Sequence, residues 1–600
     1  MKSLLPTLLL LSVAVSAGAG ADAAAAPRGV DLVLLNGHVL TVDARDSVAQ
    51  ALAVRDGRVF AVGSNRSIRA LIGPGTTVID LRGRTATPGL IDAHAHISSG
   101  GLAAVTSVDL GGARSIGEVV ALLAARAKTL APGAWLLGSG WDEGKLAEHR
   151  YVEAQDLDAA APANPVWIDH TTGHYGTANS RALALAGITA ASVDPPAGTI
   201  DRDATGAPTG VMKEGARDLM VSFIPEPSSA DRRAGILASV RLMNREGMTA
   251  AKDPNIYPAD WDAYSSLAAE GLLTAHVCTL WNTGTTLVSA EAMIARLASL
   301  PGPRSHPAGA DLVSCGVKLF MDGSGGARTA WVYDDWNRQS VSLDRGNHGY
   351  PLIEPDVYRA VVRLFNDAGI HIGTHAIGDR AIDWVVDSYA EALTAHPGLG
   401  LRHSIIHANI PTDGAIATMA RLQRQFDAGY PEAQAPFSWW IGDTYAANFG
   451  PARAARLNPF RTYLERGVRW AGGSDYDVTP LPARFGLWAS IARETLQGTW
   501  GRQPFGSRES VDVHAALRSY TVWAARQLFI EDEAGSLERG KSADVAVWDR
   551  NPYTVPTAEL KDLQCELTLY RGRIVHRAEH SALRIRAGAV RASGSAASGT

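Results

Sequence analysis

Eight short apolar segments that alternate with helical segments constrain the fold of this chain more than any other feature. The helical segments include SIGEVVALLAARAKTL and DVYRAVVRLFNDAG, in which apolar residues recur at helical spacing. The strand-like segments are ATPGLIDAH, GMTAAKD, TAHVCTLW, CGVKLFMD, GIHIGTHA, HSIIHAN, YPEAQAPF and GVRWAGGSD. Strands that alternate with helices favour a parallel α/β architecture. Eight such units predict a TIM barrel, with a doubly wound open sheet as the alternative.

The two ends of the chain have a different pattern. Residues 30–85 contain runs such as VDLVLLNGHVLTVDA, in which β-branched and polar residues alternate between turns, and they predict a small antiparallel sheet. Residues 535–577 have the same character, which suggests one β domain built from both chain ends. The predicted division is 27–86 and 531–577 for the β domain, 87–530 for the barrel with an insertion at about 100–235, and 578–600 as a disordered tail rich in Ala, Ser, Gly and Arg.

Residues 1–26 have the features of a secretory signal peptide. One lysine precedes an apolar stretch from Leu4 to Val15, and small residues follow it. That stretch is shorter than the roughly 20 residues that a membrane-spanning helix needs. We therefore expect cleavage and export of a soluble protein, periplasmic or extracellular, without stable membrane association.

The net charge of the chain indicates which kinds of partner it can bind. A net charge of -5 without a long basic run gives no electrostatic footprint for nucleic acid, so a small-molecule partner is expected, and a homo-oligomer stays open.

The three cysteines, Cys278, Cys315 and Cys565, can form at most one disulfide. Buried free thiols are the expected state.

Polar residues cluster where the predicted strands end. His94 and His96 are two positions apart, so in an extended strand both imidazoles point to one face. The other members are Lys318 in the fourth segment, His375 in the fifth, His407 in the sixth and Asp475 in the eighth. In a barrel these ends converge, and the set can hold one or two divalent ions, most simply Zn²⁺. Taken singly, His375 could be a core histidine, Lys318 an edge residue and Asp475 a turn former.

Several longer motifs agree with this arrangement and carry a family resemblance. They are PGLIDAHAH, GSGWDE, GHYGTANSRAL, GVMKEGA, VKLFMDGSGGARTA, THAIGDRA, RHSIIHA, GSDYDV and GSLERGKSADVAVWD. From about Val30 to His576 the chain resembles the metal-dependent amidohydrolase superfamily. Within it, the segments around Lys318 and His375 resemble amidohydrolase family 3, which includes N-substituted formamide deformylase-like proteins.

The resemblance implies a (β/α)₈ TIM barrel beside a β-sandwich made from both chain ends. It also implies a set of metal ligands: His94, His96, Lys318, His375, His407 and Asp475. Lys318 would be carboxylated and would bridge two ions. Two dications repel a free ammonium, whereas a carbamate presents anionic oxygens, so this role suits a lysine in such a place. With a single metal, Lys318 would have another task.

The chain departs from the family 3 pattern at three places. Lys252 and Asp253 stand where a histidine and an aspartate are common, and Thr172 precedes Gly173 and His174 where Asp-Gly-His is common. Ile406, in place of glutamate, precedes His407. Different substrate contacts and a different surrounding of His407 are expected. Glu214 is a candidate additional site residue, with a surface role as the alternative.

The function that the resemblance implies is hydrolysis of a non-peptide carbon–nitrogen bond, in a linear N-acyl or N-formyl amide. Asp475 would shuttle the proton from water to the leaving nitrogen, and His174 would contact the substrate or stabilise the oxyanion, or be structural. Trp141, Trp167 and Tyr175 would wall an apolar pocket or pack in the core. The alternatives are a cyclic amide, carbamate or ester as substrate, or an inactive binding or regulatory protein that keeps the fold.

Overall fold

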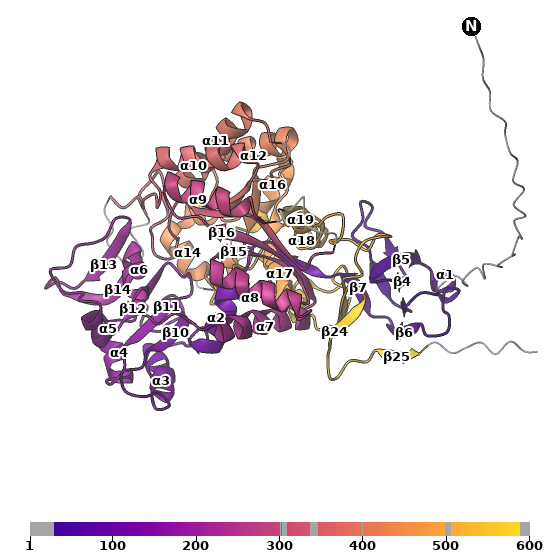
Figure 1. The fold of residues 1–600 in the computed structure, drawn as a ribbon, viewed down its shortest axis with the longest axis horizontal. Helices are drawn as coiled ribbons and strands as arrows, with labels where there is room; N and C mark the ends of the chain where they lie inside the picture. The colour runs from indigo at the N-terminus through magenta and orange to yellow at the C-terminus, as the bar shows by residue number, and fades with distance from the viewer. Residues whose placement is uncertain are drawn as a thin grey trace, which may run out of the picture.

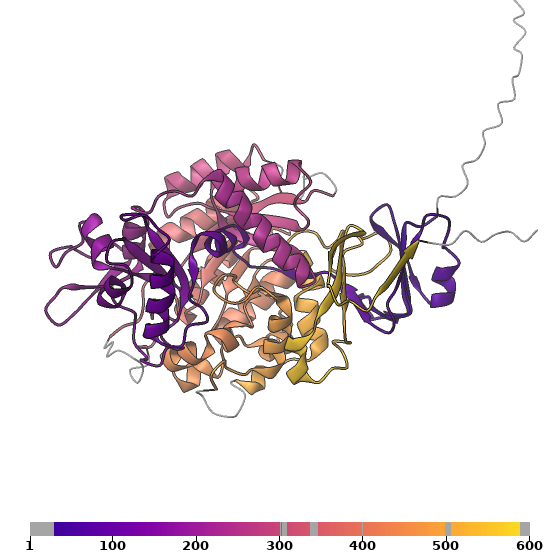
Figure 2. The same ribbon diagram turned by 90° about the horizontal axis from the view of Figure 1, so that it is seen from below.

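A (β/α)₈ barrel forms the centre of the molecule, with an inserted α/β region on one side and a β-sandwich on the other (Figures 1 and 2). This computed structural model describes residues 29–300, 302, 309–336, 346–398, 400–498 and 506–587. The predicted signal peptide, residues 1–26, lies outside the described residues.

The barrel is one parallel sheet of eight strands in the order β21-β20-β19-β18-β17-β16-β15-β8. A hydrogen bond from Ala93 N–H to the carbonyl of Gly472, 2.9 Å, joins the first strand region to the last and closes the sheet. The strands are β8 (Leu90–Asp92), β15 (Met248–Ile256), β16 (His276–Asn282), β17 (Leu312–Phe320), β18 (His371–Ala376), β19 (Ser404–His407), β20 (Tyr430–Ala433) and β21 (Ala471–Gly472). The predicted barrel is confirmed, and closure excludes the open sheet.

Amphipathic helices cover the outside of the barrel. Helix α10 (Pro355–Asp367) shows why such segments fold locally: Glu354 caps its first turn by accepting the Val357 N–H, proline occupies the first turn, and Val361, Val362 and Phe365 are buried against the sheet. The other outer helices include α7 (Ser229–Arg245), α8 (Pro258–Ala269), α9 (Leu287–Leu297), α11 (Asp379–Ala395) and α12 (Asp413–Phe426).

A separate mixed sheet forms the insertion between the first two barrel strands. Its strand order is β13-β14-β12-β11-β10-β9. The strands are β9 (Val108–Asp109), β10 (Leu136–Trp141), β11 (Val166–His170), β12 (Tyr175–Ala178), β13 (Gly198–Arg202) and β14 (Pro208–Glu214), and the helices are α3 (Ile116–Ala127), α4 (Ala154–Ala160), α5 (Ser180–Leu185) and α6 (Gly215–Val221). Helices α2 (Ile97–Thr106) and α7 pack together at its base, where Gly101 and Gly235 permit close approach.

The β-sandwich combines both chain ends, as predicted. Its two sheets have the orders β25-β6-β1-β4-β5 and β24-β23-β22-β7-β2-β3. A shared core joins the two sheets and includes Leu34 from the N-terminal part and Val547 and Leu567 from the C-terminal part. The strands are β1 (Leu32–Leu35), β2 (His38–Leu40), β3 (Val48–Ala49), β4 (Ala51–Arg55), β5 (Arg58–Gly63), β6 (Thr77–Asp80), β7 (Thr85–Pro88), β22 (Val545–Trp548), β23 (Cys565–Tyr570), β24 (Arg573–Arg577) and β25 (Arg584–Ala587).

The structure differs from two expectations about this domain. Its sheets are mixed and not purely antiparallel, because β1 pairs in parallel with β6, and β2 with β7. In each pair the two strands are adjacent in the sheet but separated by other strands in the sequence. Residues 578–587 are not part of a disordered tail: β25 pairs antiparallel with β6 and supplies an edge of the sandwich, with Leu583 buried in its core. Because β25 pairs with a strand more than 500 positions away, its own short sequence gives little indication that it forms a strand. Residues 588–600 lie outside the described residues.

Two of the three cysteines form a disulfide, which corrects the expectation of free thiols. Cys278 on β16 and Cys315 on β17 are bonded, with their Cα atoms 5.6 Å apart. Adjacent strands bring two side chains within the separation that a disulfide needs. Cys565 is the buried free thiol that the sequence predicted.

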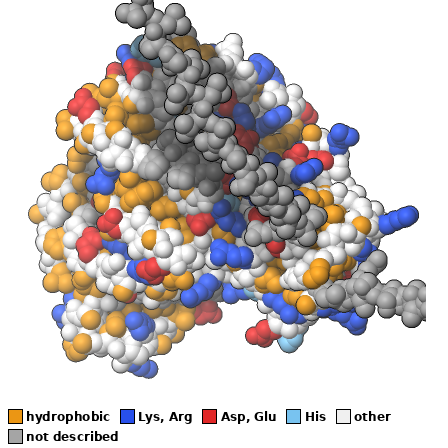
Figure 3. Space-filling model, turned by 45° about the vertical axis from the view of Figure 1, so that its right-hand side comes forward, with side chains coloured by type: hydrophobic (Ala, Val, Ile, Leu, Met, Phe, Trp, Pro, Cys, Tyr) orange, Lys and Arg blue, Asp and Glu red, His pale blue; other side chains and the backbone are white. Residues whose placement is uncertain are grey.

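On the face drawn in Figure 3, acidic and basic side chains are interspersed among apolar ones. Among the described residues, no helix is both long enough and apolar enough to cross a membrane.

Candidate metal centre and substrate pocket

The six predicted metal-binding residues all lie toward the carboxyl-terminal end of the barrel strands. They are His94 and His96 after β8, Lys318 in β17, His375 in β18, His407 at the end of β19 and Asp475 after β21. Strand pairing sets their relative height, because Lys318 is in register with Gly373, and His375 with Ile406. The barrel topology therefore brings together residues that span most of the chain.

Asp475 lies in the middle of this group. Its Oδ1 is 3.2 Å from Nε2 of His94 and 3.2 Å from Nε2 of His96. Ligand atoms of His94, His407 and Asp475 all lie within 4.8 Å of one another, and the three residues are buried. The ring centroids of His375 and His407 are 4.5 Å apart. Five of the predicted ligands thus converge on one small region.

Unpaired atoms in this region show that the residues fit a divalent metal. Both ring nitrogens of His94, Oδ1 of Asp475 and Oε2 of Glu432 are buried without a hydrogen-bond partner among the described residues. A buried polar atom left unpaired costs about 1–3 kcal/mol. Imidazole nitrogens and a carboxylate oxygen that converge without hydrogen bonds between them form a donor set suited to Zn²⁺ and similar ions. The site therefore fits the metal that the sequence predicts.

The backbone at two of these residues is strained. His407 has φ 73° and Asp475 has φ 56°, both in the left-handed region that non-glycine residues rarely adopt. Such conformations cost on the order of 1–3 kcal/mol and persist where the surrounding structure imposes them, commonly at functional sites. The strain at His407 and Asp475 agrees with a role for both in the site.

Neighbouring groups orient the imidazole rings. His375 Nε2 donates to the carbonyl oxygen of Gly323 at 2.9 Å, which leaves Nδ1 as its possible ligand atom. His407 Nδ1 lies 2.7 Å from Oε1 of Gln434, which leaves Nε2. Hydrogen bonds of this kind fix the tautomer and the direction of a metal-binding histidine. Burial raises the pKa of Asp92 to about 7, and this carboxyl accepts the backbone N–H of His94.

A buried ion pair lies beside His94. Lys252 Nζ is 2.5 Å from Oε1 of Glu432, and both side chains have no exposed surface. The other oxygen of Glu432 is 3.7 Å from Nδ1 of His94. Burial opposes ionisation of Glu432, but the charge of Lys252 together with His94 and His371 lowers the pKa of Glu432 to about 2. Lys252, which departs from the family pattern, is therefore the charge partner of Glu432. The carboxylate of Glu432 in turn contacts His94, a candidate metal ligand.

Lys318 is buried in the same region, with 2% of its surface exposed. Burial lowers the pKa of Lys318 to about 8, although the negative charges of Asp475 and Glu432 oppose this shift. Burial also acts on Asp475, where it raises the pKa, but the imidazoles of His94 and His96, each with Nε2 3.2 Å from Oδ1, hold the pKa of this carboxyl well below its usual value. Asp475 therefore carries a negative charge in this site.

A small pocket opens over the metal centre. Its polar side holds three of the candidate ligands, His375, His407 and Asp475, together with Thr172 and His174 from the insertion. Its apolar side is formed by Ile377, Phe437, Tyr445 and Val478. The pocket therefore combines apolar walls with polar groups that can act on a polar bond.

His174 and Glu214 form a pair at the edge of this pocket. The loop between β11 and β12 carries His174, and Glu214 ends β14. Nδ1 of His174 is 3.1 and 3.0 Å from the two carboxylate oxygens of Glu214. The His174 ring centroid lies 5.0 Å from that of His375. The structure thus buries Glu214 beside His174 and excludes the surface role that was its alternative.

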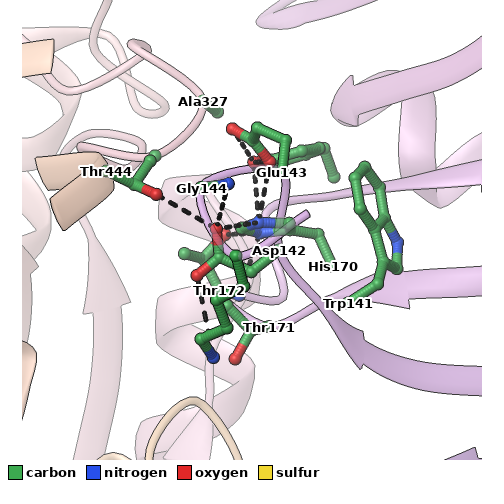
Figure 4. A network of polar contacts seen from close by, with 12 residues as sticks. Trp141, Asp142, Glu143, Gly144, His170, Thr171, Thr172, Ala327 and Thr444 are labelled. Atoms are coloured by element: carbon green, nitrogen blue, oxygen red, sulfur yellow. Dashed lines mark hydrogen bonds and ion pairs between the residues drawn. The ribbon is translucent and has the colours of Figure 1, made fainter. Parts of the chain in front are cut away.

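A second buried polar cluster lies in the insertion beside the pocket (Figure 4). His170 Nε2 is 3.2 Å from Oε2 of Glu143 and 4.0 Å from Oδ1 of Asp142. The Tyr175 hydroxyl donates to Glu143, and Thr444, in α14 (Gly442–Phe449), donates to Asp142 at 3.0 Å. The hydrogen bond from Thr444 to Asp142 thus links the insertion to a barrel loop.

The aromatic residues predicted as pocket walls lie elsewhere. Trp141 and Tyr175 are in the core of the insertion, and Trp167 is in a neighbouring core cluster of that region. None of the three lines the pocket described above. The alternative of core packing is the correct one for all three residues, since each belongs to a sheet whose faces are covered.

Sequence reasoning missed several residues of the site. The sequence gives no prediction for Glu432, Phe437 or Tyr445, although it predicts a strand at YPEAQAPF. A glutamate inside an otherwise apolar strand was the available signal for Glu432, because carboxylates are rarely buried without a partner. For Phe437 and Tyr445, on short helices after β20, the sequence offers no comparable signal.

Comparison with known proteins agrees with the fold and the site. The model of an amidohydrolase family matches residues 77–576. The chain is 31% identical to the N-substituted formamide deformylase of Arthrobacter pascens over 559 residues, which covers 90% of this chain and 97% of that protein. It is 29% identical to the protein LONG AFTER FAR-RED 3 of Arabidopsis thaliana over 537 residues, 88% of this chain and 89% of that one.

A solved structure has the same fold. The crystal structure of an uncharacterized metal-dependent hydrolase from Pyrococcus horikoshii superposes with a TM-score of 0.67 at 23% identity, over 88% of this chain and 99% of that one. The family match spans the barrel and reaches into both parts of the sandwich. With the converging histidines and Asp475, these matches lead to one conclusion: the chain belongs to the amidohydrolase family and is a metal-dependent hydrolase of non-peptide carbon–nitrogen bonds.

Proposed function

We propose that the protein hydrolyses a linear N-acyl or N-formyl amide of a small molecule. The observation that carries this proposal is the pocket itself, in which Asp475 lies beside Phe437 and Tyr445, with the unpaired nitrogens of His94 next to Asp475. Similarity to a formamide deformylase over nearly the whole chain supports the same substrate class. An apolar amine substituent would suit the aromatic wall.

The residues of the site divide the chemistry between them. His94, His96, His375, His407 and Asp475 would hold one or two divalent ions, with Zn²⁺ as the proposed metal, and a carboxylated Lys318 would bridge two of them. A bound ion would lower the pKa of water toward about 7 and polarise a carbonyl. Asp475 would accept the proton of the attacking water and pass it to the leaving nitrogen, since an amine leaves poorly unless it is protonated.

Substrate profiling tests this proposal directly. Purified protein loaded with Zn²⁺ should release amine from members of a panel of N-formyl and N-acyl amines. The matched comparisons are cyclic amides, carbamates and esters with the same apolar substituent. Faster turnover of any of these three classes than of every linear amide would overturn the assignment. Binding without turnover of any compound would favour a binding or regulatory protein.

We expect up to two divalent ions per chain, and a carboxyl group on Lys318. Burial keeps the pKa of Lys318 near 8, so a neutral amine that can capture CO₂ is accessible at mildly alkaline pH. Elemental analysis measures the ions. High-resolution crystallography of metal-loaded protein shows whether density continues from Nζ between two ions. An uncapped Lys318 beside one fully occupied metal would refute the bridge, and full activity after chelation would refute metal dependence.

We also propose that the protein is exported after cleavage between about Ala17 and Pro27. The disulfide between Cys278 and Cys315 supports this location, because disulfides persist in oxidising compartments and are rare in the cytosol. N-terminal sequencing of protein from the periplasm or medium should begin within that range. Recovery of uncleaved chain from the cytoplasm alone would contradict export.

A further inference from the structure

The hydrogen bonds around Glu214 determine which nitrogen of His174 carries a proton. Thr329 accepts the backbone N–H of Ser324 at 2.9 Å, and its own hydroxyl donates to Oε1 of Glu214 at 2.5 Å. Glu214 is therefore an acceptor toward Thr329. Since a carboxylate has only acceptors, His174 Nδ1, 3.0 Å from Oε2, must be the donor.

The chain holds Glu214 in this place at some cost. The backbone N–H of Glu214 donates to the carbonyl of His174 at 2.8 Å, so the two residues are joined through both backbone and side chain. Glu214 has φ 49°, a conformation that strains a non-glycine residue. A Cβ at Gly323 would lie 2.4 Å from Oε1 of Glu214, so this glycine makes room for the carboxylate. Strain and close packing together indicate that the His174 contact is imposed by the fold.

The tautomer of His174 has a consequence for the pocket. A neutral imidazole that donates from Nδ1 carries its lone pair on Nε2. His174 lines the pocket together with His375, His407 and Asp475. With Nδ1 occupied by Glu214, the atom that His174 can offer to a substrate is the acceptor Nε2. The natural partner for an acceptor beside the scissile bond is the N–H of a secondary amide.

We propose that Glu214 is a positioning residue that fixes His174 Nε2 as a hydrogen-bond acceptor for the substrate N–H, so that the enzyme selects secondary amides over N,N-disubstituted amides. This inference rests on the proposed amide hydrolysis. A site built to pair a substrate N–H discriminates strongly against an analogue that lacks the group, because its own acceptor is then left unpaired. A discrimination of about 10- to 100-fold is expected for one such contact.

The test compares the best secondary amide of the panel with its N-methyl derivative at about pH 8.5, well above the usual pKa of histidine. The wild-type enzyme should prefer the secondary amide by at least about 10-fold in kcat/KM. Glu214→Gln should reduce this preference several-fold or more, mainly by raising KM for the secondary amide, because the glutamine amide can donate to His174 and permit the other tautomer. Steric exclusion of the methyl group would instead persist in the variant.

Two further variants complete the experiment. Asp218→Asn makes the same carboxylate-to-amide change one turn away, at a side chain that is 78% exposed, and should leave the preference unchanged. Thr329→Val, which removes the hydroxyl that donates to Glu214, should lower the preference less than Glu214→Gln and provides the readout if the latter does not fold. Metal content should be that of the wild type in all three.

The outcomes separate the two proposals. Turnover of linear amides without a preference for the secondary amide, or with a preference that survives both Glu214→Gln and Thr329→Val, would overturn this inference and leave the proposed function standing. Failure of the wild-type enzyme to hydrolyse any amide would overturn the proposed function and this inference with it.

Discussion

Replacement of Asp475 by asparagine should lower kcat by at least about 100-fold, the contribution typical of proton transfer by a placed carboxylate. Asp475 is ionised in the site, since the adjacent imidazoles of His94 and His96 act against burial and hold its pKa well below the usual value. Asparagine keeps the size of the side chain but cannot carry the proton. Steady-state kinetics with the best amide of the panel, together with metal analysis, measures the effect.

The control for this variant is Asp477→Asn. Asp477 is exposed and lies two residues further along the same loop, so its replacement should leave kcat within about 3-fold of the wild type. Both variants should show the far-ultraviolet circular dichroism of the wild type. If Asp475→Asn folds, retains its metal and turns over at the native rate, Asp475 is not the proton shuttle.

Replacement of Lys252 by methionine should destabilise the protein by about 3–5 kcal/mol, because it leaves the carboxylate of Glu432 buried and without its charge partner. Both side chains are fully buried, and their charged atoms are 2.5 Å apart. Methionine fills a similar volume, so the lost ion pair and not a cavity dominates the change. Denaturant-induced unfolding of metal-free protein, monitored by tryptophan fluorescence, gives the free-energy difference.

Two variants calibrate this result. The double variant Lys252→Met with Glu432→Gln removes both charges and should be less destabilised than the sum of the two single variants. Lys541→Met breaks an ion pair with Glu538, whose side chain is 51% exposed, and should cost at most about 1 kcal/mol. A Lys252→Met variant as stable as Lys541→Met would show that the buried pair does not stabilise the barrel.

The sequence alone determined the elements and the position of most of the candidate site. Strand-like segments, helical periodicity and the two β-rich ends predicted the barrel and the sandwich, because each of these signals lies within a short window of the chain. The same reasoning placed His94, His96 and Asp475 at strand ends, and barrel topology then requires such residues to converge. What the sequence determined was therefore local, or followed from a general rule of the fold.

Only the tertiary structure decided which side chains meet. Lys252 and Glu432 are 180 positions apart, and Glu214 and Thr329 are 115 apart, so no local pattern marks either contact. The bond between Cys278 and Cys315 depends on the register of β16 and β17, and the last edge of the sandwich depends on pairing of β25 with β6. Such contacts are set by how whole elements pack, and packing depends on side chains from the entire chain at once.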